Sequence, residues 1–429
     1  MHITELQASR VINALKIGVN PKMDLDILCV GRDLEIDEFK RCINYVKNSN
    51  GMVKFITGEY GTGKSFLLQV IGKIAKENGF VVSKFQVDQG MKFNKLDDIY
   101  YAIMHNLTAK GILNPESSFE DLFKRWIEKL KEDKDVVPEK VKTVIEQIVH
   151  YNNAFAIAFT SYIRAQINND LELSNASSAW IKGEKSLTAA TKAKFNVKAT
   201  VDKTNALDFL KTFIKLLTLI DYSGLVVLVD EMELVVDERK DIRSSAYEIL
   251  RTLIDLCASG ELSNCMFVFA GTNQLFENEE RGISTYAALQ KRIGAGFDRK
   301  DLQLRDLRKP VVKIRGLGPE DLVKLTKNIV FLHKQLYSWT PLLSEETIQD
   351  YVELSCRRFG NRVSEANIRE YLKKLVDILD LMEQNPGNDL LKNEVSLLRK
   401  HNRDIEPYRD KSLYDNPFIE GDNEDITLT

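Results

Sequence analysis

The octapeptide Gly58-Glu59-Tyr60-Gly61-Thr62-Gly63-Lys64-Ser65 constrains the fold of this chain more than any other segment. It has the form Gly-x-x-x-x-Gly-Lys-Ser, a phosphate-binding loop whose backbone N–H groups enclose phosphate oxygens. The apolar run 52–57 precedes the loop and predicts a strand, and the run 66–71 follows it and predicts a buried helix. Because this strand–loop–helix context is the one that the motif requires, the sequence predicts a nucleotide-binding α/β fold.

Each part of the loop has an expected contact with the nucleotide. Lys64 would reach the β- and γ-phosphates, and the Ser65 hydroxyl would bind Mg²⁺. The N-terminus of the following helix adds a partial positive charge. The residues predicted to line this part of the site are Gly58, Glu59, Tyr60, Gly61, Thr62, Gly63, Lys64, Ser65 and Phe66. ATP with Mg²⁺ is the predicted ligand.

A second motif follows the apolar run 224–229, which ends in Asp230 and Glu231. A continuous apolar run predicts a strand that is buried on both faces of a parallel sheet. Asp230 would hold the magnesium hydration shell beside Ser65, and Glu231 would orient the attacking water. An acid directly after the metal-binding aspartate is typical of ATPases with an additional catalytic glutamate.

A third apolar run, residues 265–270, ends in Gly271-Thr272-Asn273. In ATPases of this class, the strand beside the acidic strand ends in a polar side chain aimed at the γ-phosphate. Thr272 and Asn273 are both candidates for this sensor, and the alternative is a turn that only reverses the chain. Further strands are predicted at 80–87 and 311–314. Together they predict a five-stranded parallel sheet of the AAA-like P-loop class, with ligands bound at the carboxyl ends of the strands.

Composition narrows the setting. The 429 residues carry a formal charge of −3, so no global basic field recruits nucleic acid. The N-terminus lacks the features of a signal peptide, and no apolar stretch is long enough to span a bilayer. Five scattered cysteines and five unclustered histidines argue against a disulfide framework or a zinc site. We expect a cytoplasmic protein without membrane contact.

The chain is predicted to consist of five parts. They are residues 1–109, the first part of the ATPase core; 110–205, a helical insertion; 206–317, the rest of the core; 318–385, a helical lid; and 386–429, an extension with an acidic tail. Within the insertion, one helix is expected over 138–167. The segment from Lys182 to Lys203 is polar, rich in lysine and predicted to be mobile. It contacts DNA phosphates in one interpretation and is a solvated loop in the other.

Three further patterns suggest residues that act on the nucleotide. Gly31-Arg32-Asp33 resembles a Gly-Arg-Glu signature that lies near the adenine in AAA-like initiator and signalling ATPases; alternatively, Asp33 is a helix N-cap. Arg362 follows Gly360 at a predicted lid-helix start, where an arginine would reach the phosphates. Arg292, or else Arg299, would reach the γ-phosphate of a neighbouring subunit in a homo-oligomer. The alternative for Arg362 is an ordinary capped helix, and the alternative for Arg292 and Arg299 is a solvated face.

Taken together, these motifs and the element Trp180-Ile181-Lys182-Gly183-Glu184 resemble the bacterial ATP-binding proteins of BREX-type phage-defence clusters. The resemblance spans roughly residues 11–379, and Trp-x-x-Gly-Glu is its most family-specific part. It implies an ATP-hydrolysing AAA-like enzyme that works with a helicase-like partner on DNA or in a defence complex. Family members often have proline where this chain has Asn273, which favours Thr272 as the sensor.

Two other functions remain open at this stage. A non-hydrolysing switch or scaffold would bind ATP stably and recruit a partner through the helical insertion. A transposition-type ATPase would deliver a recombinase to DNA. The chain has no recognisable winged-helix or zinc module for direct reading of a DNA sequence.

Overall fold

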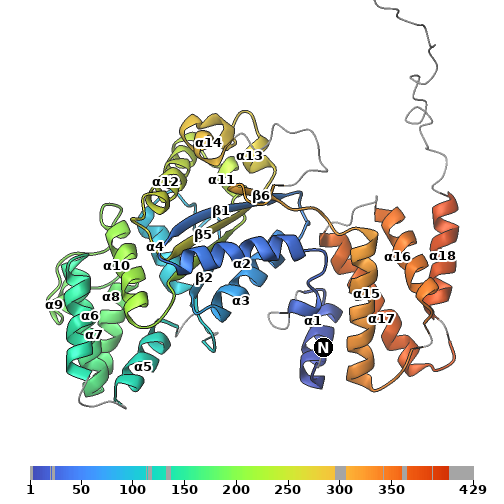
Figure 1. The fold of residues 1–429 in the computed structure, drawn as a ribbon, viewed down its shortest axis with the longest axis horizontal. Coiled ribbons are helices and arrows are strands. Elements are labelled where there is room, and N and C mark those ends of the chain that lie inside the picture. The colour runs from blue at the N-terminus through green and yellow to red at the C-terminus, as the bar shows by residue number, and fades with distance from the viewer. Residues whose placement is uncertain are drawn as a thin grey trace, which may run out of the picture. The chain divides into compact units, whose positions relative to one another are not determined.

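The computed structural model describes residues 3–19, 21, 25–112, 114, 118–131, 137–294, 306–341, 343–359, 365–388 and 390–404. The chain divides into two compact units, Gly31–Gly316 and Met1–Val30 with Leu317–Thr429. The first unit contains the sheet and the phosphate loop, whereas the described part of the second is helical (Figure 1).

A six-stranded sheet lies at the centre of the first unit, in the order β3-β2-β4-β5-β1-β6. The strands are β1 (Gly51–Gly58), β2 (Val81–Gln86), β3 (Leu107–Thr108), β4 (Leu225–Asp230), β5 (Cys265–Thr272) and β6 (Val311–Lys313). The five predicted parallel strands are confirmed, and β3 adds a short antiparallel edge beside β2. Because β5 lies between β1 and β4, the three motif-bearing strands end next to one another, as the predicted P-loop class requires.

Helices cover both faces of this sheet. Alternate residues of a strand point to opposite faces, so Val227 and Leu228 belong to different layers. On one side, Gly72 of α3 lies so close to Leu228 that an added Cβ would be 3.1 Å from its side chain. On the other side, Val227 and Phe269 join a continuous core with α4, α10 and α12. The helices concerned are α2 (Asp33–Lys47), α3 (Lys64–Glu77), α4 (Leu96–His105), α10 (Ala206–Leu219) and α12 (Lys240–Ala258).

The predicted helical insertion is present between β3 and α10. It contains α5 (Ser118–Lys131), α6 (Val137–Val149), α7 (Asn153–Asn168), α8 (Leu171–Ile181) and α9 (Ala189–Ala193). In its interior, the Phe123 ring packs edge-to-face against Phe159 and Tyr162. The prediction of a single helix over 138–167 was wrong, because the helix is interrupted between α6 and α7. There the Asn152 side chain accepts a hydrogen bond from the Phe155 N–H at 2.9 Å and caps a new helix.

The segment from Lys182 to Lys203, predicted to be mobile, is anchored by apolar side chains. Phe195, Val197 and Val201 are buried, and the Phe195 ring packs against Trp180. Polar composition concealed these three anchors, which are spread over seven positions.

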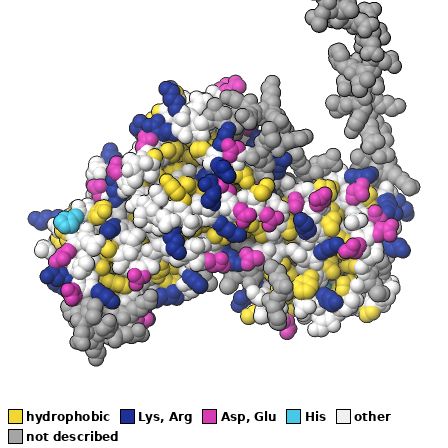
Figure 2. All heavy atoms as spheres, viewed as in Figure 1, with side chains coloured by type: hydrophobic (Ala, Val, Ile, Leu, Met, Phe, Trp, Pro, Cys, Tyr) yellow, Lys and Arg dark blue, Asp and Glu magenta, His cyan; other side chains and the backbone are white. Residues whose placement is uncertain are grey.

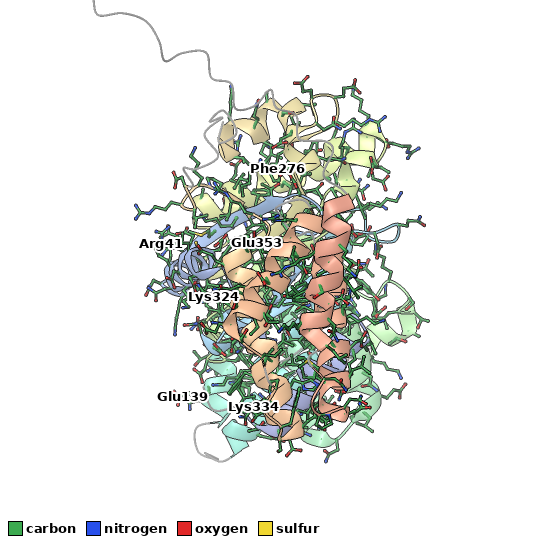
Figure 3. All side chains as sticks on the ribbon, turned by 90° about the vertical axis from the view of Figure 1, so that its right-hand side faces the viewer. Arg41, Glu139, Phe276, Lys324, Lys334 and Glu353 are labelled. Carbon is green, nitrogen blue, oxygen red and sulfur yellow. The ribbon has the colours of Figure 1, made fainter. Side chains whose placement is uncertain are left out.

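The second unit consists of α1 (Glu5–Lys16), α15 (Pro319–Tyr337), α16 (Glu345–Phe359), α17 (Glu365–Gln384) and α18 (Leu390–Asp404), with the short η1 (Leu25–Ile27). Figure 3 marks α15 by Lys324 and Lys334 and α16 by Glu353. Helix α18 packs against α16, so the predicted extension begins with a helix.

Helix α1 is joined to α15 and α17 by a buried polar network. Lys16 Nζ lies 2.8 Å from Asp380 Oδ2 and donates to the Tyr337 hydroxyl at 3.0 Å. His333 Nδ1 accepts from Trp339 Nε1–H at 2.8 Å, so Nε2–H is left to donate to Asp380 Oδ1 at 3.0 Å. Burial lowers the pKa of His333. The first helix therefore belongs with the C-terminal helices, although its sequence position groups it with the core.

The remaining helical elements are α11 (Leu234–Asp237), α13 (Gln274–Glu277), η2 (Ile283–Thr285) and α14 (Ala287–Ile293). Within the described residues, no helix combines the length and hydrophobicity that crossing a bilayer requires.

Candidate functional site

Two glycines shape the phosphate loop between β1 and α3. Gly61 and Gly63 have φ angles of 85° and 89°, in the left-handed region that glycine occupies without steric cost. Gly63 is the N-cap of α3, so the loop ends where the free N–H groups of that helix begin. The loop therefore presents backbone donors and a helix N-terminus, which together suit a phosphate group.

Gly58, the first residue of the motif, lies in a crowded position at the end of β1. A Cβ added there would be 2.6 Å from Thr62 Oγ1 and 2.9 Å from the Ile314 carbonyl oxygen. The loop is also closed internally, because the Thr62 N–H and hydroxyl donate to the Glu59 carbonyl at 3.3 and 3.0 Å. A larger residue at position 58 would have to displace either the loop or the end of β6.

Lys64 is buried, with 7% of its surface exposed. Its ammonium donates to the carbonyl oxygens of Gly58 and Glu59 at 3.3 and 3.0 Å, within the loop itself. In contrast, Tyr60 is 76% exposed, so this predicted loop residue contributes its backbone to the loop and turns its ring to solvent.

Arg32 supports the loop from behind. Its guanidinium donates to the Thr62 carbonyl at 2.7 Å and to the Arg315 carbonyl at 2.6 Å, and it lies 3.6 Å from the Glu35 carboxylate. It thereby ties the phosphate loop to the chain that leaves β6. Gly31 has a φ of 64° and helix α2 begins at Asp33, with Arg32 rather than Asp33 as its N-cap residue. Contact of Gly31 and Arg32 with an adenine stays a prediction.

Asp230 and Glu231 stand at the carboxyl end of β4. Asp230 is 7% exposed, and its Oδ1 accepts the Glu231 N–H at 3.1 Å. Glu231 has a φ of 57°, a left-handed conformation that a glutamate rarely adopts and that costs on the order of 1 kcal/mol or more. Such strain concentrates at functional sites, so it supports the predicted role of Glu231 in catalysis.

Glu233 is a carboxylate of the site that the sequence analysis missed. Its Oε2 accepts the Thr272 N–H at 3.2 Å, and an added Cβ on Gly271 would lie 3.4 Å from the same oxygen. Burial raises the pKa of Glu233, Asp230 raises it further, and the Lys64 ammonium opposes both effects. The Lys64 ammonium and the Asp230 carboxylate therefore both act on Glu233 electrostatically, while its hydrogen bond is the one from Thr272.

The two sensor candidates lie at the end of β5. Thr272 is the register partner of Gly58 on β1. The fully buried Thr57 hydroxyl donates to Asn273 Oδ1 at 3.1 Å, so Asn273 is linked to the phosphate-loop strand.

The acidic spacing Glu231-x-Glu233, followed by the apolar Leu234-Val235-Val236, was the sequence signal that could have identified Glu233.

The predicted magnesium ligands have suitable chemistry. Ser65 is the second residue of α3 and Asp230 ends β4, so a hydroxyl and a carboxylate are offered at the same edge of the sheet. Magnesium prefers oxygen ligands and usually binds one or two protein groups together with phosphates and water. Within the described residues, no cluster of three or more His, Cys, Asp or Glu side chains is arranged to hold a metal.

The arginines predicted to act on the nucleotide fall into two groups. Arg362 and Arg299 lie outside the described residues. Arg292, on α14, makes a two-pronged ion pair with Asp255 of α12 and donates to the Ala288 carbonyl at 2.7 Å. The hydrogen bond to Asp255 raises the pKa of Arg292. In this conformation, the Arg292 guanidinium is bound to residues of its own chain.

The lysine-rich segment is also engaged within the chain. Lys182 pairs with Glu120 at 3.0 Å, Lys185 with Asp97 at 2.7 Å, and Lys194 with Glu172. On the face shown in Figure 2, basic and acidic side chains are interspersed. These pairs neutralise lysines that a DNA backbone would need, which favours the interpretation of this segment as a packed, solvated surface.

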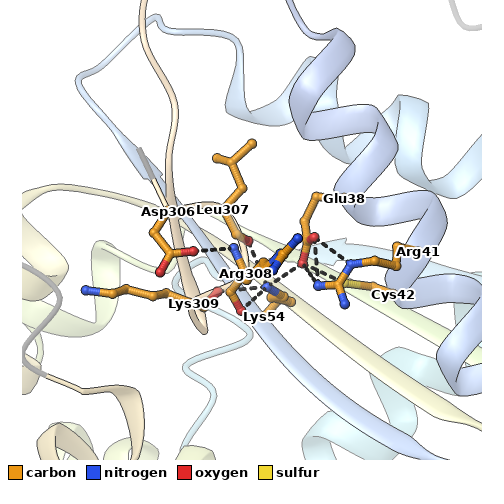
Figure 4. Close-up of polar contacts among 8 residues, drawn as sticks. All are labelled: Glu38, Arg41, Cys42, Lys54, Asp306, Leu307, Arg308 and Lys309. Carbon is orange, nitrogen blue, oxygen red and sulfur yellow. Dashed lines mark hydrogen bonds and ion pairs between the residues drawn. The ribbon is translucent and has the colours of Figure 1, made fainter. Parts of the chain in front are cut away.

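Behind the site, β6 is held against β1 by the buried Lys54 (Figure 4). Its ammonium donates to Glu38 Oε1 at 2.9 Å and to the carbonyls of Leu307, Arg308 and Lys309 at 3.0, 3.0 and 2.7 Å. One buried cation thus fixes the chain that leads into β6, whose far end Arg32 ties to the phosphate loop.

The family model for the BREX system ATP-binding protein BrxC/D matches residues 3–395. The chain belongs to this BrxC/D family. The match covers both units, so it includes the phosphate loop, the insertion and the C-terminal helices, and it confirms the resemblance carried by Trp180-x-x-Gly183-Glu184. ATP binding and membership of a BREX system follow from the family.

Among solved structures, the BrxC/D chain is similar to the replication initiator DnaA bound to AMPPCP and single-stranded DNA. The identity is 14% over 90% of this chain and 70% of that one, with a TM-score of 0.36. It is also similar to Aeropyrum pernix ORC2. For the ADPNP–ADP complexes the identity is 13% over 81% of this chain and 68% of that one, with a TM-score of 0.34. For the ADP form the identity is 12% over 89% of this chain and 90% of that one, with a TM-score of 0.32. No protein of curated function matches the sequence.

Proposed function

We propose that this BrxC/D protein hydrolyses ATP as part of a BREX phage-defence assembly in the cytoplasm. The observation that carries the proposal is the strand order, in which β5 lies between β1 and β4, together with the hydrogen bond from Thr272 N–H at the end of β5 to Glu233 after β4. The phosphate loop, the end of the acidic strand and the proposed sensor therefore lie at the same carboxyl edge of the sheet, where such folds bind ligands.

In the proposed reaction, each residue has a separate task. Lys64 leaves the loop carbonyls and binds the β- and γ-phosphates, and Glu231 orients the water for in-line attack on the γ-phosphorus. Magnesium, held by Ser65 and the shell around Asp230, would neutralise charge that develops on the phosphates. Thr272 or Asn273 would bind the γ-phosphate and report its release through β5.

The partners belong to the same proposal. A helicase-like or other defence-complex protein would use the motion that follows phosphate release, and a homo-oligomer would bring Arg292 or Arg299 to a neighbouring site. Arg362 would act from the C-terminal helices of the same chain.

Steady-state phosphate release, measured with and without DNA, tests the proposal. Glu231→Gln should lower turnover by at least about a hundredfold while ATP still binds, because charge and position at the attacking water are lost. Lys64→Ala should remove ATP binding itself, since it deletes the cation that faces the phosphates. Tight ATP binding by the wild-type protein without turnover, even with DNA and the other BREX proteins, would instead identify a nucleotide-dependent switch.

A further inference from the structure

A groove of about 720 Å³ opens beside the carboxyl end of β2, where helix α4 meets the segment after α8. Its lining comes from β2 and the loop after it (Phe85, Gln86, Asp88, Gly90, Met91), from α4 (Asp98, Tyr101, Ala102, His105, Asn106) and from residues 184–186. None of these residues belongs to the proposed nucleotide site.

The Trp180-x-x-Gly183-Glu184 element lines this groove through Glu184, and its other residues support that position. The buried Trp180 ring packs against Phe209, and its Nε1–H donates to the Ala199 carbonyl at 2.8 Å. Gly183 has a φ of 87°, and an added Cβ would lie 3.4 Å from the Tyr100 ring. Tryptophan thus fixes the end of α8, and glycine turns the chain tightly over α4. The result is that Glu184 is held at the edge of the groove.

Glu184 meets an aromatic pair on α4. The rings of Tyr101 and His105 are stacked, with centroids 3.9 Å apart and planes at 24°. His105 Nε2 lies 3.0 Å from Glu184 Oε1. Burial, and then the nearby Glu184 carboxylate, raise the pKa of Tyr101. Tyr101 is 37% exposed. The groove therefore offers a flat aromatic surface next to a carboxylate whose position is fixed.

The charge of the lining selects the ligand. The lining contains three carboxylates, Asp88, Asp98 and Glu184, and one lysine, Lys185. The Lys185 ammonium lies 2.8 Å from Asp98 and 2.7 Å from Asp97, which is outside the lining. Asp88 is oriented by two backbone N–H groups, those of Gly90 and Met91, at 2.7 and 2.8 Å. This excess of carboxylates repels phosphate. A guanidinium group, in contrast, stacks on aromatic rings and pairs with carboxylates.

We propose that this groove binds an arginine side chain presented by a basic segment of a protein partner. The arginine plane would lie on Tyr101, and its N–H groups would donate to Glu184 and Asp88. The Trp180-x-x-Gly183-Glu184 element would then serve recognition of the partner, separately from ATP chemistry.

The groove is also in direct contact with the acidic strand. Gln86, in its lining, is the register partner of Asp230, and the next residue, Val87, donates its N–H to the Asp230 carbonyl at 3.0 Å. Further along the same loop, Lys92 pairs with Glu238 at 3.1 Å, and the Phe93 ring packs edge-on against Phe269 of β5. A partner in the groove therefore contacts the loop that holds the end of β4.

Fluorescence anisotropy with the full chain tests the site. The probe is a labelled Gly/Ser peptide with two arginines, and the matched peptide carries uncharged citrulline in their place. We expect the arginine peptide to bind at least about tenfold more tightly, because charge-assisted hydrogen bonds are lost with citrulline. Glu184→Gln and Asp88→Asn should each weaken binding about fivefold or more.

The control variant is Glu172→Gln, which removes an exposed carboxylate outside the groove and should leave binding unchanged. Asp88 lies on a loop, so Asp88→Asn keeps the test valid even if Glu184→Gln disturbs the packing of His105. Equal affinity for both peptides, equal effects of all three variants, or displacement of the peptide by a poly-dT oligonucleotide would overturn the proposal.

Discussion

Glu233 accepts the backbone N–H of Thr272 at 3.2 Å, so a single carboxylate joins the segment after the acidic strand to the end of the sensor strand. Gly271 permits this approach, because its missing side chain leaves the carboxylate room. The bond spans the edge of the sheet at which ATP is proposed to bind. It holds the segment after β4 against the end of β5, and the proposed roles of Glu231 and Thr272 require such fixed positions.

Substitution of Glu233 should separate this tethering role from the charge. Glu233→Gln keeps an oxygen that can accept the Thr272 N–H, whereas Glu233→Ala leaves that N–H without it. A lost hydrogen bond of this kind is worth about 1–1.5 kcal/mol, so we expect Glu233→Ala to lower kcat about five- to tenfold and Glu233→Gln to lower it much less. An equal loss in both variants would show that the charge matters rather than the tether. Thermal unfolding of each variant controls for stability.

The Thr57–Asn273 hydrogen bond gives a second test of the sensor. Thr57→Val keeps the shape of the side chain and removes the hydroxyl that donates to Asn273 Oδ1. We expect a several-fold loss of kcat with little change in ATP affinity. Thr212→Val is the matched control, because Thr212 is equally buried and its hydroxyl bonds only the Asp208 carbonyl within α10. If both variants retain wild-type turnover, Asn273 has no part in hydrolysis.

Much of the site could be predicted because its signals are local. The loop ending in Lys64-Ser65 and the apolar run ending in Asp230 are contiguous patterns, and parallel strands bring their ends to one edge. The sequence could likewise single out the Trp180 element, but it could not predict what that element does. At Gly183 the chain turns closely over α4, beside the groove, and no spacing in the sequence reveals that turn.

The features that escaped prediction depend on long-range contacts. In the sequence, Glu233 resembles an ordinary acidic residue on a solvent-facing turn. Its position against β5 depends on the room left by Gly271, which is far along the chain. The sequence of helix α1 does not indicate which helices it packs against. Its buried apolar face lies on α15 and α17, and Lys16 pairs with Asp380 of α17. The segment from Lys182 to Lys203, which was predicted to be mobile, is packed because the Phe195 ring contacts Trp180. In each case, a tertiary contact outweighs local composition.

The Lys54 network should contribute strongly to stability. Lys54→Met would leave Glu38 buried without its main counter-charge and remove the donor from three carbonyls, which costs about 3–5 kcal/mol. Lys40→Met is the control, because the exposed Lys40–Asp37 pair should be worth less than about 1 kcal/mol. Urea unfolding measures both free energies. A similar small loss in the two variants would contradict the proposed anchoring of β6.

The same network should make stability depend on pH. Burial alone would raise the pKa of Glu38, but hydrogen bonds from Lys54 and Arg41 hold it below its ordinary value of 4.5. A carboxyl whose folded-state pKa is lowered contributes stability above the unfolded-state pKa and loses it as the pH falls through the folded-state value. We therefore expect the unfolding free energy of Glu38→Gln to fall less steeply than that of the wild type below about pH 4.5. Parallel curves would exclude Glu38 as a source of the acid sensitivity.

Arg292 can be tested for action on a neighbouring subunit through its partner Asp255. If Arg292 serves the γ-phosphate of a neighbour, Asp255 competes for its guanidinium. Asp255→Asn should then raise turnover by up to about fivefold at high protein concentration, because an exposed ion pair holds its arginine only weakly. Arg292→Ala should remove the concentration-dependent part of the turnover, since an arginine acting in trans contributes about a thousandfold or more. Turnover measured over a hundredfold range of protein concentration distinguishes the outcomes. An unchanged concentration dependence in both variants would leave Arg292 with only its structural role between α14 and α12.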